Sequence, residues 1–449
     1  MPPSSDLISG PPRPMSLAGP SLARNSNIIE KNTYFQEAVK SEKPSSSSNV
    51  ESNWAPTKLR AVPAFYPLER STRLVEDPLE DVVARVSEAN RVLSIHAVYC
   101  DETATASLLT AENVEMQMSL WKTGGPNHPQ GIAVELQRRK GDSIAFHRYS
   151  RCLLDAVVGD FNAEDYAETY GADYIDVMYS KKLQRILSLE TLSEEATELE
   201  NAIIALEIAH GLLMKDRMDA RQLGLESLCL LTDPNKTGMG TALIASRVVL
   251  LGTSQDPDAD QDEDVLYDEG PFQEIRQTIL SLVQLRRIGE TDTFEDDAVA
   301  VEDEEHMTIL HNLALAVLAN SLDVIENEEG YDTTPEDSKP SARDRLGSAS
   351  SMCESFLEEA EEVFGNKEIL KTLISELGKA GDKPHNACLS AKCIGSLCRA
   401  SDKARRRAKE LGAKTVVQTA LEVGTRTHLK LEKECQKVMT TLNTTTTTD

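Results

Sequence analysis

The feature that most constrains the fold is helical periodicity in the second half of the chain. From about residue 163 to 442, apolar residues recur at i, i+3, i+4 and i+7, the spacing of one helix face. Acidic stretches interrupt this pattern at 253–270, 290–305 and 327–350, and we expect them to be disordered insertions. The region 163–442 is therefore predicted to be all-α, with each helix burying one stripe against its neighbours.

A repeat is visible within this region. Residues 223–252 (LGLESLCLLTDPNKTGMGTALIASRVVLLG) resemble residues 392–421 (KCIGSLCRASDKARRRAKELGAKTVVQTAL), and each predicts a helix of small residues, a turn and a second helix. Cys229 aligns with Cys398, at a separation close to four units of about 42 residues. The run Cys393 to Cys398, followed by charged residues and Leu411-Gly412-Ala413, resembles an armadillo repeat. This resemblance to armadillo/HEAT proteins implies an α-solenoid of roughly four to six units.

Residues 77–160 have a different pattern. Asp77-Pro78 predicts a helix start, after which Leu79, Val82, Val83 and Val86 mark one face. Apolar and polar residues then alternate in short runs, which predicts an antiparallel sheet with one buried face. The predicted strands are Ser94–Cys100, Thr103–Leu109, Val114–Trp121 and Gly131–Arg139, with a fifth, Ser143–His147, that leads into a closing helix from Arg151 to Val158.

The end of this region carries a second resemblance. WKTG at 121–124, then GIAVELQRRKGDSIAFHRYSRCLL at 131–154, resembles the kinase-associated domain 1 at the C-termini of MARK-type and AMP-activated kinases. The resemblance covers about 80 residues and implies an α+β fold that docks on a kinase domain or on anionic phospholipids. The chain lacks the glycine loop, VAIK, HRD and DFG motifs of a kinase domain itself.

The terminal segments are expected to be disordered. Residues 1–76 are rich in Ser, Pro and Asn, and 443–449 are mostly Thr. Leu59–Leu68, with Phe65 and Tyr66, is a candidate for docking on the folded part. Because the N-terminus has no signal-peptide pattern and no apolar run approaches about 18 residues, we expect a cytoplasmic protein, with the nucleus as the alternative.

The net charge of the chain restricts the kinds of partner that it can bind. Lys and Arg number 47 against 74 Asp and Glu, for a formal net charge of −27, so nucleic acid is not an expected ligand. The negative field favours a basic or amphipathic protein segment, and the second resemblance adds a kinase as a candidate partner. The eight cysteines are scattered, and those that cluster sit at helical spacing in apolar runs, which favours a reducing compartment. Nothing in the sequence indicates the oligomeric state.

One basic cluster is a candidate binding site for an anionic ligand. It would hold lipid headgroups or an acidic partner segment if its side chains converge. The alternative is an ordinary solvated edge. The cluster consists of Arg138, Arg139, Lys140, Arg148 and Arg151.

Two metal patterns are incomplete. Asp258, Asp260, Asp262, Asp264 and Glu269 occupy positions 1, 3, 5, 7 and 12 of a calcium loop, but Glu263 replaces the glycine at position 6 and Gly270-Pro271 follows the loop. An acidic linker is the favoured interpretation. His385 with Cys388, Cys393 and Cys398 lacks the paired spacing of structural zinc, so these residues are expected in the helical core.

No catalytic template fits the sequence. There is no HExxH, GxSxG, phosphate loop, GxGxxG or CxxC pattern. We therefore expect a non-catalytic scaffold or regulatory adaptor without metal or cofactor, in which the helical repeats bind an extended partner segment. A peripheral membrane adaptor that uses the basic cluster is the alternative.

Overall fold

The fold is described from a computed structural model. It describes residues 54–63, 65–124, 131–162, 195–254, 269–284, 297–327, 352–358, 360 and 369–444. Several predictions lie outside these residues: disorder before residue 54 and after 444, the acidic insertions over 255–268, 290–296 and 328–350, and the four aspartates of the calcium pattern.

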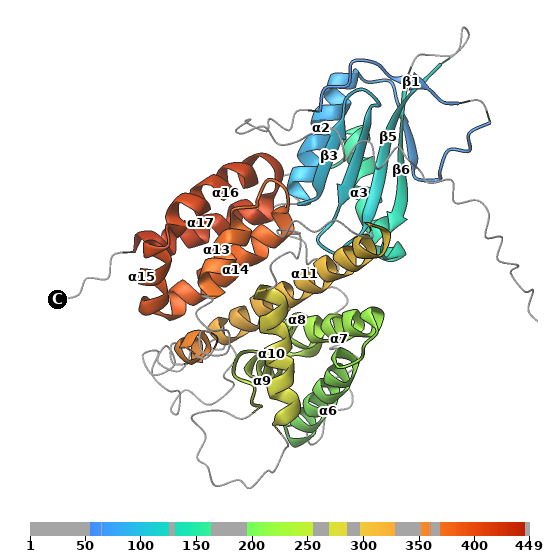
Figure 1. The fold of residues 1–449 in the computed structure, drawn as a ribbon. Coiled ribbons are helices and arrows are strands. Elements are labelled where there is room, and N and C mark those ends of the chain that lie inside the picture. Colours follow the sequence, from blue (N-terminus) through green and yellow to red (C-terminus); the bar gives the residue numbers. More distant parts are fainter. Residues whose placement is uncertain are drawn as a thin grey trace, which may run out of the picture. The chain divides into compact units, whose positions relative to one another are not determined.

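A small sheet with two helices forms the N-terminal module (Figure 1). The strand order is β2-β6-β5-β4-β3, and these neighbours pair antiparallel. Strand β1 pairs parallel with β5 at Trp121 and Lys122, beyond the point where β4 ends. The elements are β1 (Arg60–Ala61), β2 (Thr72–Val75), α2 (Leu79–Val92), β3 (His96–Cys100), β4 (Thr105–Leu109), β5 (Glu115–Thr123), β6 (Gly131–Lys140) and α3 (Ser143–Val158).

Both helices of the module cover one face of the sheet. Val82 and Val86 of α2 and Phe146 and Leu153 of α3 share a core with alternate strand residues such as Leu136. The predicted helix start is confirmed, with Val82, Val83 and Val86 buried. The predicted strand Ser143–His147 is wrong, because the Asp142 side chain accepts the Ala145 N–H (2.7 Å) and caps α3 at this point.

The module begins earlier than the sequence indicated. Trp54 is buried and stacks on Tyr99, with ring centroids 5.1 Å apart. Residues 60–61 and 72–75 form strands. Disorder predicted for residues 1–76 is therefore wrong over 54–63 and 65–76, and the docking of Leu59–Leu68 is confirmed for its described residues, although Phe65 itself is exposed.

Helices make up the rest of the described chain, as the periodicity predicted. The predicted disordered insertion at 290–305 is wrong over residues 297–305, where a helix has already begun. The elements are α6 (Glu195–Leu213), α7 (Met218–Leu231), α8 (Pro234–Thr237), α9 (Met239–Leu251), α10 (Gly270–Gln284), α11 (Asp297–Asn327), α13 (Ile369–Leu377), α14 (Pro384–Ala400), α15 (Asp402–Glu410), α16 (Ala413–Thr427) and α17 (Leu429–Asn443).

The two segments that resemble each other in sequence have the same succession of elements. Each is a helix, a short helix and a helix: α7, α8, α9 in the first and α14, α15, α16 in the second. The turn that the sequence predicted is a short helix in both, because Asp233 caps α8 at the Asn235 N–H and Ser401 caps α15 at the Ala404 N–H.

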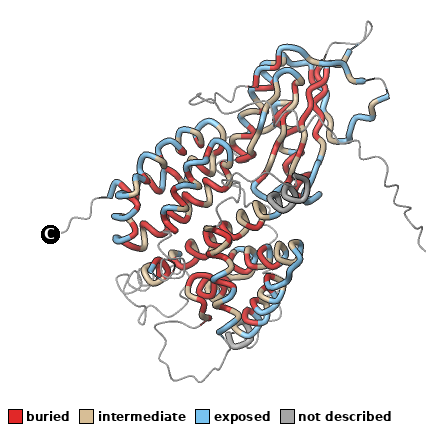
Figure 2. Tube along the Cα trace, viewed as in Figure 1, coloured by how far each residue is buried: buried red, intermediate tan, exposed pale blue. Residues whose placement is uncertain are grey.

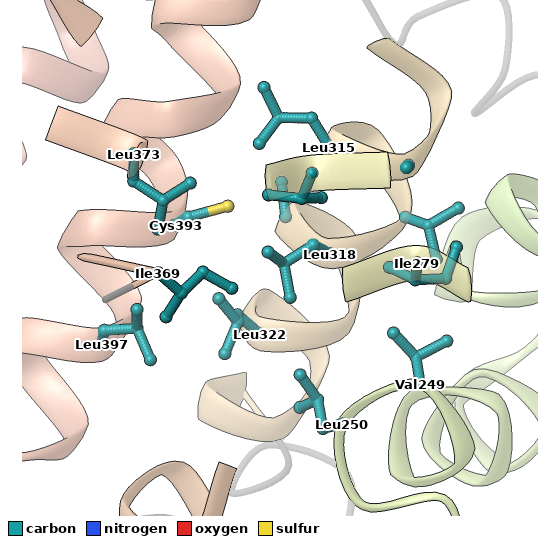
Figure 3. Packing of buried hydrophobic residues seen from close by; sticks show 14 of the residues in the cluster. Val249, Leu250, Ile279, Leu315, Leu318, Leu322, Ile369, Leu373, Cys393 and Leu397 are labelled. Atoms are coloured by element: carbon teal, nitrogen blue, oxygen red, sulfur yellow. The ribbon is translucent and has the colours of Figure 1, made fainter. Parts of the chain in front are cut away.

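Helix packing runs stepwise along the chain. Helix α7 packs on α11, α11 on α14, and α14 on α17. Helices α6, α10, α13 and α16 contact one another in the same order. One hydrophobic core continues from Ile203 to Leu442. In Figure 3, Leu318 and Leu322 of α11 lie between Val249 and Ile279 on one side and Ile369 and Leu397 on the other.

Helix α11 is the central helix of this packing. Among the described residues, its segment His306–Asn327 is the one long and apolar enough, by length and composition, to cross a membrane. However, 56% of the 18-residue apolar window within it is buried inside the fold. Figure 2 shows buried stretches along this helix. Its contacts with α7, α9, α10 and α14 account for the apolar composition, which is that of a core helix.

Candidate functional site: an apolar surface on the first helix pair

Helices α6 and α7 form a closely packed antiparallel pair. The short connection Met214–Arg217 reverses the chain between them. Gly224 of α7 allows the close approach, since a Cβ there would lie 3.0 Å from the Ala209 carbonyl oxygen and 3.1 Å from the Leu213 nitrogen of α6. The pair therefore presents two helix surfaces at a fixed spacing.

The inner sides of this pair are fixed by the neighbouring helices. His210 of α6 bonds to Glu274 of α10 (2.7 Å), and the Cys229 thiol of α7 donates to the Leu313 carbonyl of α11 (3.5 Å). Leu206 and Leu225 are buried on these inner sides. The rotation of about 100° per residue then decides which side chains face outward.

The outward sides carry exposed apolar residues. Ile208 of α6 is 61% exposed and Leu223 of α7 is 51% exposed. Helical spacing turns both away from α10 and α11, so the two rows share one side of the pair. Figure 2 shows exposed stretches along both helices. We call this the α6–α7 apolar surface; it comprises Ile204, Ile208, Leu223 and Leu230.

Carboxylates flank this surface on both helices. Glu200 and Glu207 are exposed on α6, and Asp219 and Glu226 on α7. Asp219 is paired with Arg217 (2.5 Å), and Glu226 accepts a hydrogen bond from Gln222 (2.7 Å). An apolar stripe with an acidic border has the chemistry to accept a helix with one apolar face and basic flanks.

The predicted basic cluster does not converge on one face. Ile132, Val134 and Leu136 of β6 face the helices, and Arg138 continues that row opposite Met116. The register between β5 and β6 then shifts by one residue, so Lys140 pairs with Glu115 on the face away from the helices. Arg138 donates to the Gly141 carbonyl oxygen (2.6 Å), and Arg139 is exposed. Strand alternation in the sequence would place Arg138 and Lys140 on the same face, and the register shift separates them.

The helical members of the cluster also differ from each other. The Arg148 guanidinium pairs with Glu112 and lies over the Tyr149 ring at 4.8 Å. Burial opposes the charge of Arg148, but the hydrogen bond that Arg148 donates to Glu112, together with the charge of Glu112, outweighs burial and raises the pKa of Arg148. Arg151 is well exposed, with a 3.8 Å contact to Asp155. An anionic ligand would therefore find Arg138 and Arg151 on the helix side, without Lys140.

On the sheet face away from the helices, a buried carboxylate binds a covering segment of the chain. Sequence analysis did not single out this carboxylate. Glu135 is fully buried. One oxygen accepts the Glu69 backbone N–H (2.9 Å), and the other accepts the Tyr66 hydroxyl and the Trp121 indole N–H (3.1 Å each). These bonds hold residues 66–69 against the sheet. In the sequence, Glu135 had the pattern of an outward, solvated position.

Neither metal pattern is assembled in the described residues. There, no group of three or more metal-ligating side chains occurs. Glu269 accepts a hydrogen bond from the Thr253 hydroxyl (2.7 Å), while the rest of the calcium pattern lies outside the described residues. Burial raises the pKa of the Cys393 thiol to about 12 and that of Cys398 to about 11, in keeping with the predicted core positions.

The fold places the chain in a structural class: a small sheet module is followed by helices that pack stepwise along the chain. No family model, curated protein or solved structure matches this chain.

Proposed function

We propose that the protein is a non-catalytic scaffold or regulatory adaptor of the cytoplasm or nucleus, and that its helices bind a basic, amphipathic segment of a partner protein. The observation that carries this proposal is the α6–α7 apolar surface with its acidic border. We also propose that the helices form an armadillo-like solenoid and that the sheet module is similar to kinase-associated domain 1.

The stepwise packing supports the solenoid. In a solenoid each unit hides its apolar side against the next, so contacts follow chain order. The order α7, α11, α14, α17 has this form. A globular arrangement around one centre would instead bring α7 and α17 into contact, and no substantial contact between them is found.

The first helix pair of the described helical region, α6–α7, exposes more apolar side chains than the last pair, α16–α17, and this difference favours binding at α6–α7. A terminal solenoid unit usually has a polar outer side. Helices α16 and α17 follow that rule, since the large exposed apolar side chains of the described residues do not include any on them. Half of those side chains lie instead on α6, α7 and the residue between them. Continued exposure of this surface to water is unfavourable, so an occupant is expected.

The energies indicate which contacts dominate. Full burial of one Ile or Leu side chain stabilises by about 1.5–3 kcal/mol. An exposed ion pair adds about 0–1 kcal/mol but accelerates the encounter at low salt. The apolar residues are therefore expected to set affinity, and the carboxylates to set the preference for basic segments.

A designed peptide tests the proposal. The probe is a labelled helical peptide with Leu on one face and Lys on the other, and its control has the same residues in scrambled order. Fluorescence anisotropy should show binding of the first peptide to the wild-type chain and at least tenfold weaker binding to Ile208→Asp. The matched control Ile144→Asp changes an isoleucine on α3 that is even more exposed than Ile208 and should bind like the wild type.

Three outcomes contradict the proposal. The first is equal binding by Ile208→Asp and the wild type, or by the scrambled peptide. The second is a wild-type dimer in sedimentation that Ile208→Asp abolishes, because a second copy would then occupy the surface. The third is absence of peptide binding together with faster hydrogen exchange of residues 163–194 in Ile208→Asp, because the chain's own segment would then be the occupant.

The membrane adaptor is the second candidate. Arg138 and Arg151 are exposed on the helix side of the module, which is the observation in its favour. Flotation with phosphatidylserine liposomes should recover the wild type but less of the double variant Arg138→Glu, Arg151→Glu. Equal recovery of the wild type with neutral liposomes would exclude this function.

A further inference from the structure

The α/β module is joined to the C-terminal helices by polar contacts. Helix α2 contacts α16 and α17. The Ser94 hydroxyl accepts the Lys430 backbone N–H at the start of α17 (3.0 Å), and Arg91 lies 3.4 Å from Glu432. His385 of α14 reaches the Leu109 carbonyl oxygen at the end of β4 (3.0 Å). We call these contacts the joint.

Two histidines form the centre of the joint. His428 Nε2 lies 3.1 Å from His385 Nδ1, and their rings meet edge to face with centroids 5.0 Å apart. His428 precedes α17 as its N-cap, where its Nδ1 accepts the Leu431 backbone N–H (3.1 Å). His428 is buried, and His385 is partly buried between the module and the helices.

The backbone partners fix the tautomer of each ring. Because the Leu431 N–H donates to His428 Nδ1, that nitrogen has no proton, and a neutral His428 carries its proton on Nε2. This proton is donated to His385 Nδ1. His385 then carries its own proton on Nε2, which is donated to the Leu109 carbonyl oxygen. The bonds form one directed chain from α17 through α14 to β4.

This chain leaves no place for an additional proton. Protonation of His428 would place an N–H against the Leu431 N–H, and protonation of His385 would place one against His428 Nε2–H. Burial, in addition, disfavours the charged ring. Burial is the main cause that lowers the pKa of His385 to about 4 and that of His428 well below its ordinary value, while the hydrogen bond to the Leu109 carbonyl opposes the shift of His385.

The charged and titratable neighbours do not compensate. His96 of β3 and Lys430 of α17 disfavour a positive charge on both rings. Asp382, before α14, acts on His96, whose own pKa burial lowers. Glu432 of α17 is paired with Arg91 of α2, which also holds Glu88. No described carboxylate is hydrogen-bonded to either ring of the pair.

We propose that the His385–His428 pair is an acid-sensitive clasp, which holds the α/β module on the C-terminal helices while both rings are neutral and releases it when either ring gains a proton. The clasp links the attachment of the module to the pH of its surroundings. It is independent of the partner that α6–α7 binds.

The direction of the pH dependence follows from linkage. The rings have a lower pKa in the closed joint than in the open one, where the ordinary value of 6.5 applies. The closed joint therefore has its full stability above about pH 6.5 and loses it as the pH falls toward 4. For one histidine, the open-to-closed ratio rises on the order of thirtyfold between neutral pH and pH 5.

Hydrogen exchange of the full chain tests the clasp. Peptides covering 94–109 and 428–443 are compared at pH 7.5 and 5.0, after correction for intrinsic rates, with peptides of α6–α7 as the internal reference. Exchange in the joint should rise on the order of thirtyfold relative to the reference. His385→Gln with His428→Asn keeps one donor and one capping acceptor without a titrating ring, and should remove most of the rise. His147→Gln, at an exposed histidine on α3 outside the compared and reference peptides, is the matched control and should behave like the wild type.

A second measurement covers the case in which the double variant is simply unstable. Long-range ¹H–¹⁵N spectra of the wild-type imidazoles should show both rings neutral and protonated at Nε2 at pH 7, and still neutral near pH 5.5. An Nδ1–H tautomer on either ring, titration of both near pH 6.5, or a rise in exchange that the double variant retains would overturn the proposal.

Discussion

At the scale of single residues, Glu135 shows how one side chain can organise a segment that has little regular structure. Its two oxygens accept three hydrogen bonds, from Tyr66, Glu69 and Trp121, and none of its surface is exposed. Such a carboxylate is stable because donors replace the lost water. Without Glu135, residues 66–69 would lose the hydrogen bonds that hold them on the sheet.

Glu135→Gln should therefore destabilise the module by about 1–3 kcal/mol, because an amide NH2 would face the donors that a carboxylate accepts. Urea unfolding followed by tryptophan fluorescence measures the change. Glu69→Gln is the control, since Glu69 takes part through its backbone and its side chain is exposed. If both variants unfold at the wild-type midpoint, the role given to Glu135 is wrong.

At the scale of elements, the helical region depends on central helices that are covered on both sides. Helix α14 packs on α11, α13 and α17, and Leu397 in it is fully buried. Helix α7 has neighbours only on its inner sides among the described residues, so its residue Leu230 is half exposed. A leucine in α14 is therefore expected to contribute more to the free energy of unfolding than the half-exposed leucine in α7.

Leu397→Asp should cost several kcal/mol and unfold the C-terminal helices, because an unpaired carboxylate would be buried in an apolar core. Circular dichroism during thermal unfolding detects the loss. Leu230→Asp is the matched control, and its stability should stay within about 0.5 kcal/mol of the wild type. A normal melting curve for Leu397→Asp would contradict the packing of α14.

The sequence predicted elements where their pattern is long and regular. The α2 face and strands β3 to β6 followed from periodicity. Strands β1 and β2 are too short for a pattern, and the Asp142 cap overrode strand-like residues at 143–147. The α6–α7 apolar surface could not be predicted from the sequence, because the exposure of Ile208 depends on where α10 and α11 pack. The His385–His428 pair joins distant segments, for which one sequence has no local signal.

At the scale of the whole molecule, one hydrophobic core runs through the helices and a second fills the sheet module. The joint connects the two through hydrogen bonds and an ion pair. Polar contacts of this kind respond to pH and salt more strongly than apolar cores do. The module is therefore expected to be the first part of the described chain to respond to acid, before the helices unfold.

The Ser94–Lys430 contact also has a consequence for biosynthesis. Its two residues are 336 positions apart in the chain. A ribosome that adds roughly 5–20 residues per second needs on the order of half a minute to travel that distance. During this interval the nascent sheet domain has emerged while the helices that receive it do not yet exist. Translation speed and chaperones that shield the waiting surface should therefore influence the yield of correctly assembled protein.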